Sequence, residues 1–146
     1  MDEKVSILSL MKQDHHAIES LIDTLEESLD GSYDKMKKEF EQFEWKLEKH
    51  LFIEEKAIFT FYEPEETVQG FQMLPTLVTQ HNYILNELNK MRKDVSNRKS
   101  PLGLEELKLF LMKHRNYEER DVYPNLEETL SPSQKKQVID RIKEIS

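Results

Sequence analysis

The chain has 146 residues, enough for a single domain with a substantial core, and carries a formal net charge of −8 with 34% charged residues. No cluster of lysine and arginine residues stands out, so we expect no nucleic-acid partner. The absence of cysteine excludes disulfides, thiolate metal ligands, iron–sulfur clusters and cysteine nucleophiles. No apolar run approaches a membrane span and the acidic N-terminus lacks a secretory signal pattern, so we predict a cytoplasmic protein with no membrane partner.

Four long amphipathic helices are predicted in chain order, over residues 4–29, 34–62, 71–95 and 101–128. Glycine and proline are rare in this chain, and they mark the breaks between these segments. In each segment the apolar residues recur every three or four positions, which is the period of a helix that buries one face. The expected buried stripes are Leu8, Met11, His15, Ile18, Ile22, Leu25 and Leu29; Phe40, Phe43, Leu47, His50, Glu54, Ala57 and Phe61; Leu74, Leu77, His81, Ile84, Leu88, Met91 and Val95; and Leu104, Leu107, Leu111, His114 and Glu118.

The fourth segment carries the clearest local signals and the least regular stripe. Pro101 follows Ser100 and is typical of the first position of a helix. Asp121 continues the inward stripe at its far end. Pro124 lies within the segment, and because proline removes a helical hydrogen bond we expect a kink or a break there.

A short last helix is expected over residues 132–145, because Ser131-Pro-Ser-Gln134 has the pattern of a capping box and Val138, Ile142 and Ile145 follow it. Four long amphipathic helices with short connections favour an all-α, up-and-down four-helix bundle. We predict a single domain over residues 1–146, with the bundle at about 4–130 and the short helix after it.

The sequence also contains a weak internal duplication. The pattern His15-x-x-Ile18 returns 66 residues later at His81, and the stretch HLFIEEKAIF at His50 returns 64 residues later as HRNYEERDVY at His114. The first two helices therefore correspond to the last two. We expect the first and third helices to run parallel, and likewise the second and fourth.

Six polar residues on the inward stripes form a candidate metal site. The histidines fall at similar heights on four helices, and each glutamate follows a histidine by one turn, so the side chains share one face. Burying two carboxylates costs several kcal/mol each unless they are paired, and no lysine or arginine lies on these stripes. A metal would supply the missing positive charge. The candidate ligands are His15, His50, Glu54, His81, His114 and Glu118.

The ligand types narrow the choice of metal. Imidazole and carboxylate without sulfur suit iron, manganese or zinc. Two carboxylates on opposite helices can bridge two ions, which favours a dinuclear site. A ferritin-like site is disfavoured, because it uses Glu-x-x-His on two helices and no glutamate here lies three residues before a histidine.

The residues beside these ligands have simpler interpretations. A single histidine–glutamate pair could be a surface contact between neighbouring helical turns. His16 lies about 100° around the helix from His15, so we expect it to be exposed or to support the ligands from outside. Glu55 and Glu119 are interpreted as solvated flanks, with a third carboxylate ligand as the alternative.

At residues 4–130 the sequence resembles the hemerythrin-like family of His-His-Glu cation-binding domains. The resemblance is carried by DHHAI at 14–18, HLFIEE at 50–55, QHNYI at 80–84 and HRNYEERDVYP at 114–124. It implies an up-and-down four-helix bundle that encloses two non-haem irons, bridged by two carboxylates and an oxo or hydroxo group. By position, the four inward histidines match the metal-binding histidines of the family, and Glu54 and Glu118 match the bridging carboxylates.

The sequence departs from the oxygen-carrying hemerythrins at two positions. Their third helix has a second histidine one turn after the first, where this chain has Leu85. Their last histidine is followed five residues later by aspartate, whereas Glu118 lies four residues after His114 and Glu119 lies five. Water, Glu55, Glu119 or a tyrosine is expected to take the place of the missing histidine.

The resemblance implies a di-iron protein that binds or senses oxygen, or a related small diatomic or peroxide ligand, through this centre. One alternative is a di-iron peroxidase, oxidase or nitric oxide scavenging enzyme with the same ligands. Another is a structural or regulatory bundle without metal. Zinc and manganese are less favoured than iron as the resident metal.

Overall fold

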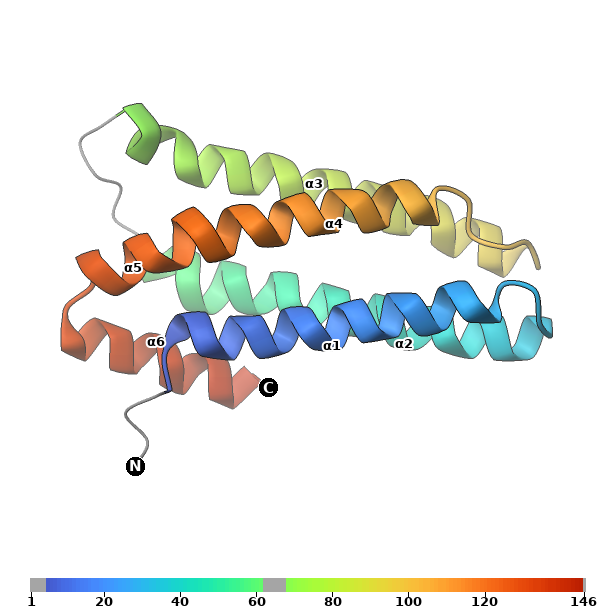
Figure 1. Ribbon diagram of the computed structural model, residues 1–146, viewed down its shortest axis with the longest axis horizontal. Helices are drawn as coiled ribbons and strands as arrows, with labels where there is room; N and C mark the ends of the chain where they lie inside the picture. Colours follow the sequence, from blue (N-terminus) through green and yellow to red (C-terminus); the bar gives the residue numbers. More distant parts are fainter. Residues whose placement is uncertain (1–4, 62–67, 146) are drawn as a thin grey trace.

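The computed structural model describes residues 5–61 and 68–145, with the side chains of 61–72 excepted. Its frame consists of α1 (Ile7–Ser28), α2 (Tyr33–Ile53), α3 (Val68–Ser96) and α4 (Leu104–Tyr117). These helices run alternately up and down the long axis of the molecule (Figure 1). The predicted all-α bundle is therefore confirmed. No helix among the described residues is both long enough and apolar enough to cross a membrane.

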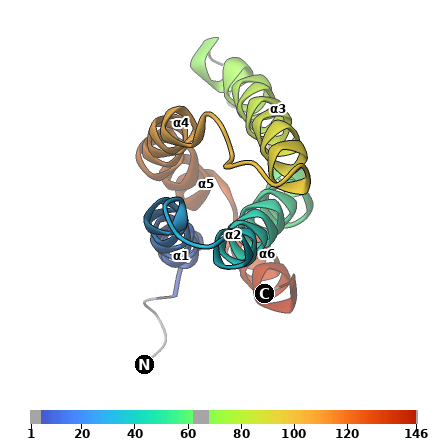
Figure 2. The same cartoon turned by 90° about the vertical axis from the view of Figure 1, so that its right-hand side faces the viewer.

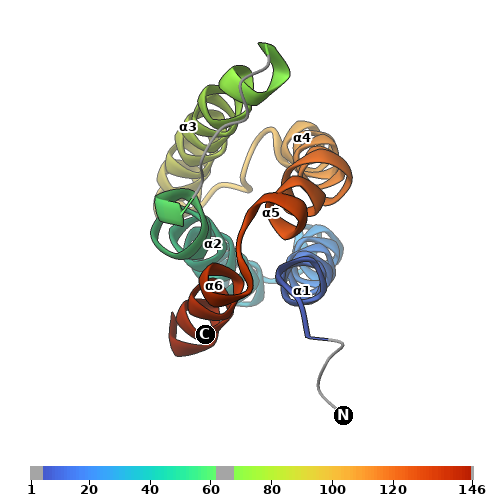
Figure 3. The same ribbon diagram turned by 90° about the vertical axis from the view of Figure 1, so that its left-hand side faces the viewer.

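The end views show α1 diagonal to α3 and α2 diagonal to α4 (Figures 2 and 3). Figure 1 shows that α1 and α3 run in the same direction, as do α2 and α4, as the internal duplication predicts. The two halves of the chain are thus related by an approximate twofold arrangement. Corresponding helices of the two halves lie diagonally across the bundle axis (Figures 2 and 3).

The ends of the first two helices follow from capping residues. Ser6 and Ser9 form a reciprocal capping box at the start of α1, and Glu127 accepts a hydrogen bond from the Ile7 N–H at 2.8 Å. Ser32 caps α2 through the Lys35 N–H. The predicted helix starts of 4 and 34 are close to those observed.

The prediction that Pro101 opens the fourth helix is wrong. The helix begins at Leu104, after Gly103, whose φ of 81° lies in the left-handed region that favours glycine. Pro101 is buried in the preceding connection, where the Leu102 N–H donates to Asp94. The chain is therefore still turning at Pro101.

The last helix closes one end of the bundle. In α6 (Pro132–Ile145), Ser131 and Gln134 form the predicted capping box, with bonds of 2.9 and 3.1 Å. Val138 and Ile142 are buried. Figure 3 shows α6 packed beside α2 at the end where α1 begins.

The core consists of two apolar clusters. One includes Phe40, Phe43 and Leu88 and lies towards the connection between α1 and α2. The other includes Met11 and Ile53 and extends to α6. The buried histidines and glutamates form the layer between the two clusters. Along α1, for example, His15 lies between Met11 of the second cluster and Ile18 of the first.

Two π-helical turns interrupt the bundle at equivalent places. The first, η1 (Glu54–Ile58), follows α2 and leads to the 3₁₀ turn η2 (Phe59–Phe61); the second, η3 (Glu118–Val122), follows α4 and leads to α5 (Tyr123–Thr129). In each turn an N–H reaches back five residues, from Phe59 to Glu54 and from Tyr123 to Glu118.

The second π-turn corrects one prediction and accounts for another. Asp121 is partly exposed, and Val122 is buried in its place, because the wider turn moves the inward face by one residue. The break expected near Pro124 is present, since Pro124 lies in the first turn of α5. The inward position predicted for Phe61 lies outside the described side chains.

Candidate metal centre

The six predicted ligands meet in the polar layer of the core. Each histidine comes from a different helix, α1 to α4 in order, and each glutamate opens one of the π-turns. All six are buried, with at most 5% of any residue exposed. Carboxylates and imidazoles that are so deeply buried need a nearby opposite charge or a bound metal ion. The six residues are His15, His50, Glu54, His81, His114 and Glu118.

Each glutamate lies between histidines of different helices. The Oε1 of Glu54 is 3.1 Å from His81 Nε2 and 3.3 Å from His50 Nε2. Glu118 places Oε1 3.1 Å from His15 Nε2 and Oε2 3.3 Å from His114 Nε2. The carboxylates are therefore central and the imidazoles peripheral, which is the arrangement that two bridging carboxylates require.

The donor atoms form two groups that share a residue. One group comprises Glu54, His81, His114 and Glu118, and the other comprises His15, His50 and Glu118. Within each group the potential ligand atoms lie within 4.8 Å of one another. Glu118 belongs to both groups and could bridge two cations.

The outer nitrogen of each histidine contacts a polar partner. His50 Nδ1 lies 2.7 Å from Asp14 Oδ2, and His114 Nδ1 lies 2.6 Å from Gln80 Oε1. An N–H donated outward leaves the lone pair of Nε2 directed into the centre, which orients an imidazole for a metal. Sequence reasoning missed both partners. Each directly precedes an inward histidine, and that position is the signal that could have identified them.

The remaining two histidines have carboxylate partners. His15 Nδ1 is 2.6 Å from Glu119 Oε2, and His81 Nδ1 is 3.4 Å from Glu55 Oε1. The interpretation of Glu119 as a solvated flank is therefore wrong, because its side chain is only 21% exposed and holds His15. Glu55 is 47% exposed and fits that interpretation better.

Tyr123 completes the centre, and no pattern in the sequence identifies it directly. Its hydroxyl donates to Glu54 Oε2 at 2.7 Å, its ring lies 6.1 Å from that of His15, and the residue is fully buried. It follows Phe59 by 64 residues, and Phe59 in turn lies 5.4 Å from His81, ring to ring. The internal duplication thus places a phenol in one half opposite a phenyl in the other.

In the metal-free centre, His50 carries a positive charge and Glu54 a negative one. Burial disfavours the charged form of His50, but the negative charge of Glu54 and the hydrogen bond to Asp14 outweigh it and raise its pKa from 6.5 to about 9. Burial works against ionisation of Glu54 too, yet the positive charge of His50 and the close approach of His114 and His81 hold the pKa of Glu54 well below 4.5. In the metal-free protein, protonated His50 is therefore the counter-ion of Glu54.

Burial shifts the pKa values of three neighbouring groups in the direction that favours their neutral forms. Burial lowers the pKa of His15 and of His114, and the charge of His50 adds to the effect. Burial and the charge of Glu54 raise the pKa of Tyr123 well above 10. His15 and His114 are thus neutral at pH 7, the form in which imidazole binds a metal.

Several buried polar atoms of the centre have no hydrogen-bond partner in the part of the protein that the structure describes, and a cation could bind to them. Among the described residues, His50 Nε2, His114 Nε2 and Glu118 Oε2 are buried and form no hydrogen bond. Buried polar atoms without partners are uncommon in folded proteins and are costly. The two histidine nitrogens lie 3.9 and 3.3 Å from a Glu118 oxygen. Cations bound between the histidines and Glu118 would give all three atoms a partner.

The other residues singled out in the sequence lie outside this layer. His16 is exposed, as predicted. Leu85, at the position of the histidine of oxygen-carrying hemerythrins, is partly buried and packs against the first apolar cluster. The tyrosine that reaches the centre is Tyr123 of α5, in the same half of the chain as Leu85.

Tyr123→Phe is expected to lower the free energy of unfolding of the metal-free protein by about 1–3 kcal/mol, because it removes a hydrogen bond to a buried carboxylate. Urea unfolding followed by circular dichroism measures this. Tyr83→Phe is the control, since Tyr83 is 37% exposed, and its effect should stay within about 0.5 kcal/mol. Equal stability of the two variants would contradict the importance of the bond to Glu54.

Comparison with known proteins agrees with this architecture. The family description "Hemerythrin HHE cation binding domain" matches residues 6–126, which include every candidate ligand. No curated protein and no solved structure matches the chain. The match covers most of the sequence and the whole histidine–glutamate layer. The chain therefore belongs to the hemerythrin HHE cation-binding domain family.

Proposed function

We propose that this protein holds two non-haem iron ions in the histidine–glutamate layer and uses them to bind or sense oxygen or a related small ligand. The observation that carries the proposal is the pair of donor groups joined by Glu118, each with two histidines. Imidazole nitrogen with carboxylate oxygen favours iron over the harder and softer cations. Manganese and zinc also bind imidazole and carboxylate ligands, and they are the less favoured alternatives.

The side chains of this layer have separable tasks. His15 and His50 would hold one ion and His81 and His114 the other, with Glu54 and Glu118 between them. The outer partners of the histidines fix the imidazole orientation. Bound iron would supply a redox-active centre for the ligand. The apolar clusters on either side would keep bulk water away from it.

A second candidate is an enzyme that turns over peroxide, oxygen or nitric oxide at the same centre. It is favoured by a cavity of about 190 Å³ that reaches His15, His50 and His114 from the surface, because turnover requires a route for substrate and product. A reductant supplied from outside would complete such a cycle.

Anaerobic titration with ferrous iron tests the binding proposal. We expect saturation at about two equivalents per chain and, after exposure to air, near-ultraviolet absorption typical of bridged ferric pairs. Parallel titrations with manganese and zinc rank the metals. A protein that takes up none of the three would be a structural or regulatory bundle, and the proposal would fail.

Repeated additions of oxygen or peroxide to the reduced protein separate the two candidates. A stable spectral change that reverses on removal of oxygen supports binding or sensing. Continued consumption of peroxide with added reductant, beyond one equivalent per centre, supports the enzyme. Free ferrous iron at the same concentration is the control for chemistry in solution.

A further inference from the structure

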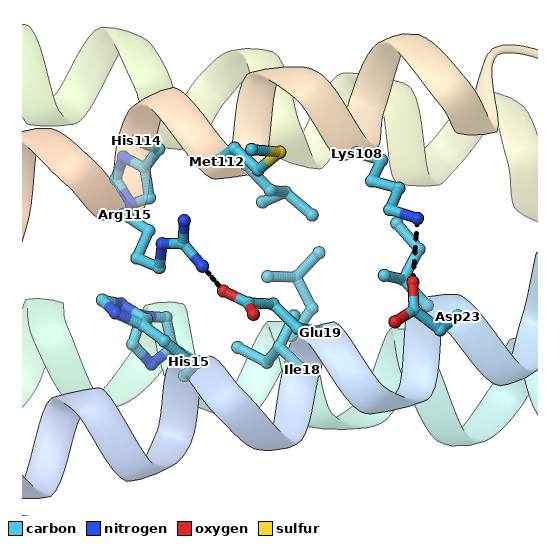
Figure 4. A pocket seen from close by; sticks show the side chains of 12 residues that line it. His15, Ile18, Glu19, Asp23, Lys108, Met112, His114 and Arg115 are labelled. Atoms are coloured by element: carbon cyan, nitrogen blue, oxygen red, sulfur yellow. Dashed lines mark ion pairs between the residues drawn. The ribbon is translucent and has the colours of Figure 1, made fainter.

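One cavity leads to the histidine–glutamate layer from the side of the bundle. It has a volume of about 190 Å³ and lies between α1, α2 and α4. Its inner end is formed by the imidazoles of His15, His50 and His114. Figure 4 shows His15 of α1 and His114 of α4 facing each other at this end.

The wall of the cavity is apolar. Ile18 and Ile22 line it from α1, Leu47 from α2, and Leu111 from α4. The first three are at most 5% exposed, so they belong to the core. An apolar wall of this kind offers a ligand dispersion contacts and no hydrogen bonds before it reaches the imidazoles.

The outer rim is charged, and its charges are paired with each other. Arg115 of α4 forms an ion pair with Glu19 of α1 (Figure 4). One turn or more away, Lys108 lies 2.8 Å from Asp23 and joins the same two helices. Each cation of the rim is paired with α1, and Lys108 lies 2.6 Å from Glu26 as well. The partly exposed Met112 lies between the two pairs (Figure 4).

The volume exceeds what a diatomic ligand needs. An apolar cavity of about 150 Å³ in a protein interior binds benzene or xenon. A charged ligand would lose its hydration against these aliphatic walls, which costs several kcal/mol without a partner. The size and the lining therefore select against small ions and for a compact neutral molecule.

We infer that this cavity is a binding site for a neutral apolar molecule of about the size of benzene, held beside the imidazoles of His15, His50 and His114. The inference goes beyond the proposed function, because it adds a second, apolar ligand beside the centre that would bind oxygen or a related small ligand. Binding itself needs no metal. It can therefore be tested on metal-free and metal-loaded protein alike.

Benzene is the probe, and the methyl resonances of methionine and leucine report its binding. We expect saturable shifts of the Met112 and Leu111 signals in the wild-type protein. Leu111→Trp should weaken benzene binding by more than about tenfold, because an indole fills the space. Leu109→Trp, on the same helix but 56% exposed and away from the cavity, is the matched control and should bind as the wild type does.

Met112→Trp is the second variant, since residue 112 is 42% exposed at the rim and tolerates a larger side chain more easily. Loss of benzene binding in either cavity variant, with retention in Leu109→Trp, supports the site. No saturable binding to the wild type, or equal binding by all three variants, overturns it. Benzene binding to a protein that takes up no metal would sink the proposed function while leaving the cavity site intact. Normal metal uptake without benzene binding would do the reverse.

Discussion

Glu118→Ala is expected to remove both metal ions, lowering uptake from about two per chain to nearly none. Glu118 belongs to both donor groups, and its two oxygens face His15 and His114 in different halves of the bundle. Without it the group of His15 and His50 loses the one carboxylate among its three members, and the other group loses one of four donors. The two ions are thus coupled through one side chain.

Metal content after anaerobic loading and desalting measures this effect. Glu128→Ala, which removes an exposed carboxylate from α5, is the control and should retain the full metal complement. Circular dichroism of both metal-free variants verifies that they are folded. Undiminished metal content in Glu118→Ala would refute the shared-ligand arrangement, whereas loss of one ion only would mean that Glu118 serves a single site.

The layout of the bundle is predictable from the sequence because apolar residues recur every three or four positions along the full length of each helix. The stripe positions of His50 and Glu54 follow from a spacing of four residues, and both are buried as expected. The error at Asp121 has a definite cause. The π-turn begins at Glu118 itself, and an i to i+5 hydrogen bond leaves no mark in a pattern of apolar residues.

The outer partners were harder to predict because they depend on contacts between helices. Asp14 holds a histidine of α2 from α1, and Glu119 holds a histidine of α1 from the turn after α4. Neither pair is close in sequence, so spacing along one helix does not reveal it. Only the crossing of the helices brings these groups within hydrogen-bonding distance.

The internal duplication makes the differences between the two halves informative. Asp14 and Gln80 occupy equivalent positions, but one carries a negative charge and the other is neutral. Tyr123 and Phe59 are equivalent too, and only Tyr123 donates a hydrogen bond to the centre. In space both polar groups lie on the side of the centre that contains His15 and His50, because Asp14 contacts His50 and the ring of Tyr123 lies against that of His15. The uneven protonation of the metal-free centre is consistent with this.

The metal-free protein is expected to lose stability as the pH rises from about 6.5 to about 9, because its folded state holds a proton on His50 more tightly than the unfolded chain does. The folded pKa is above the unfolded one, so this contribution is complete below pH 6.5 and is lost as the pH passes about 9. A shift from 6.5 to about 9 corresponds to on the order of 3 kcal/mol.

The groups that face His50 determine this behaviour. Glu54 and Glu118 approach its Nε2 at 3.3 and 3.9 Å, and Asp14, itself paired with Lys46, holds its Nδ1. The ring of His15 lies 4.8 Å away and is neutral, since burial lowers its pKa. Asp14→Asn removes one of the two main charges that favour the proton, so the stability loss should move to lower pH.

Urea unfolding of the chelator-treated protein at several pH values between 6 and 10 measures the effect. Asp23→Asn, which removes a more exposed carboxylate from the same helix, should leave the pH profile of the wild type unchanged. A flat profile, or identical profiles for Asp14→Asn and wild type, would contradict the assignment of the proton to His50. Because a metal binds only the neutral imidazole, the same proton must leave on metal binding, and metal affinity should therefore rise with pH over this range.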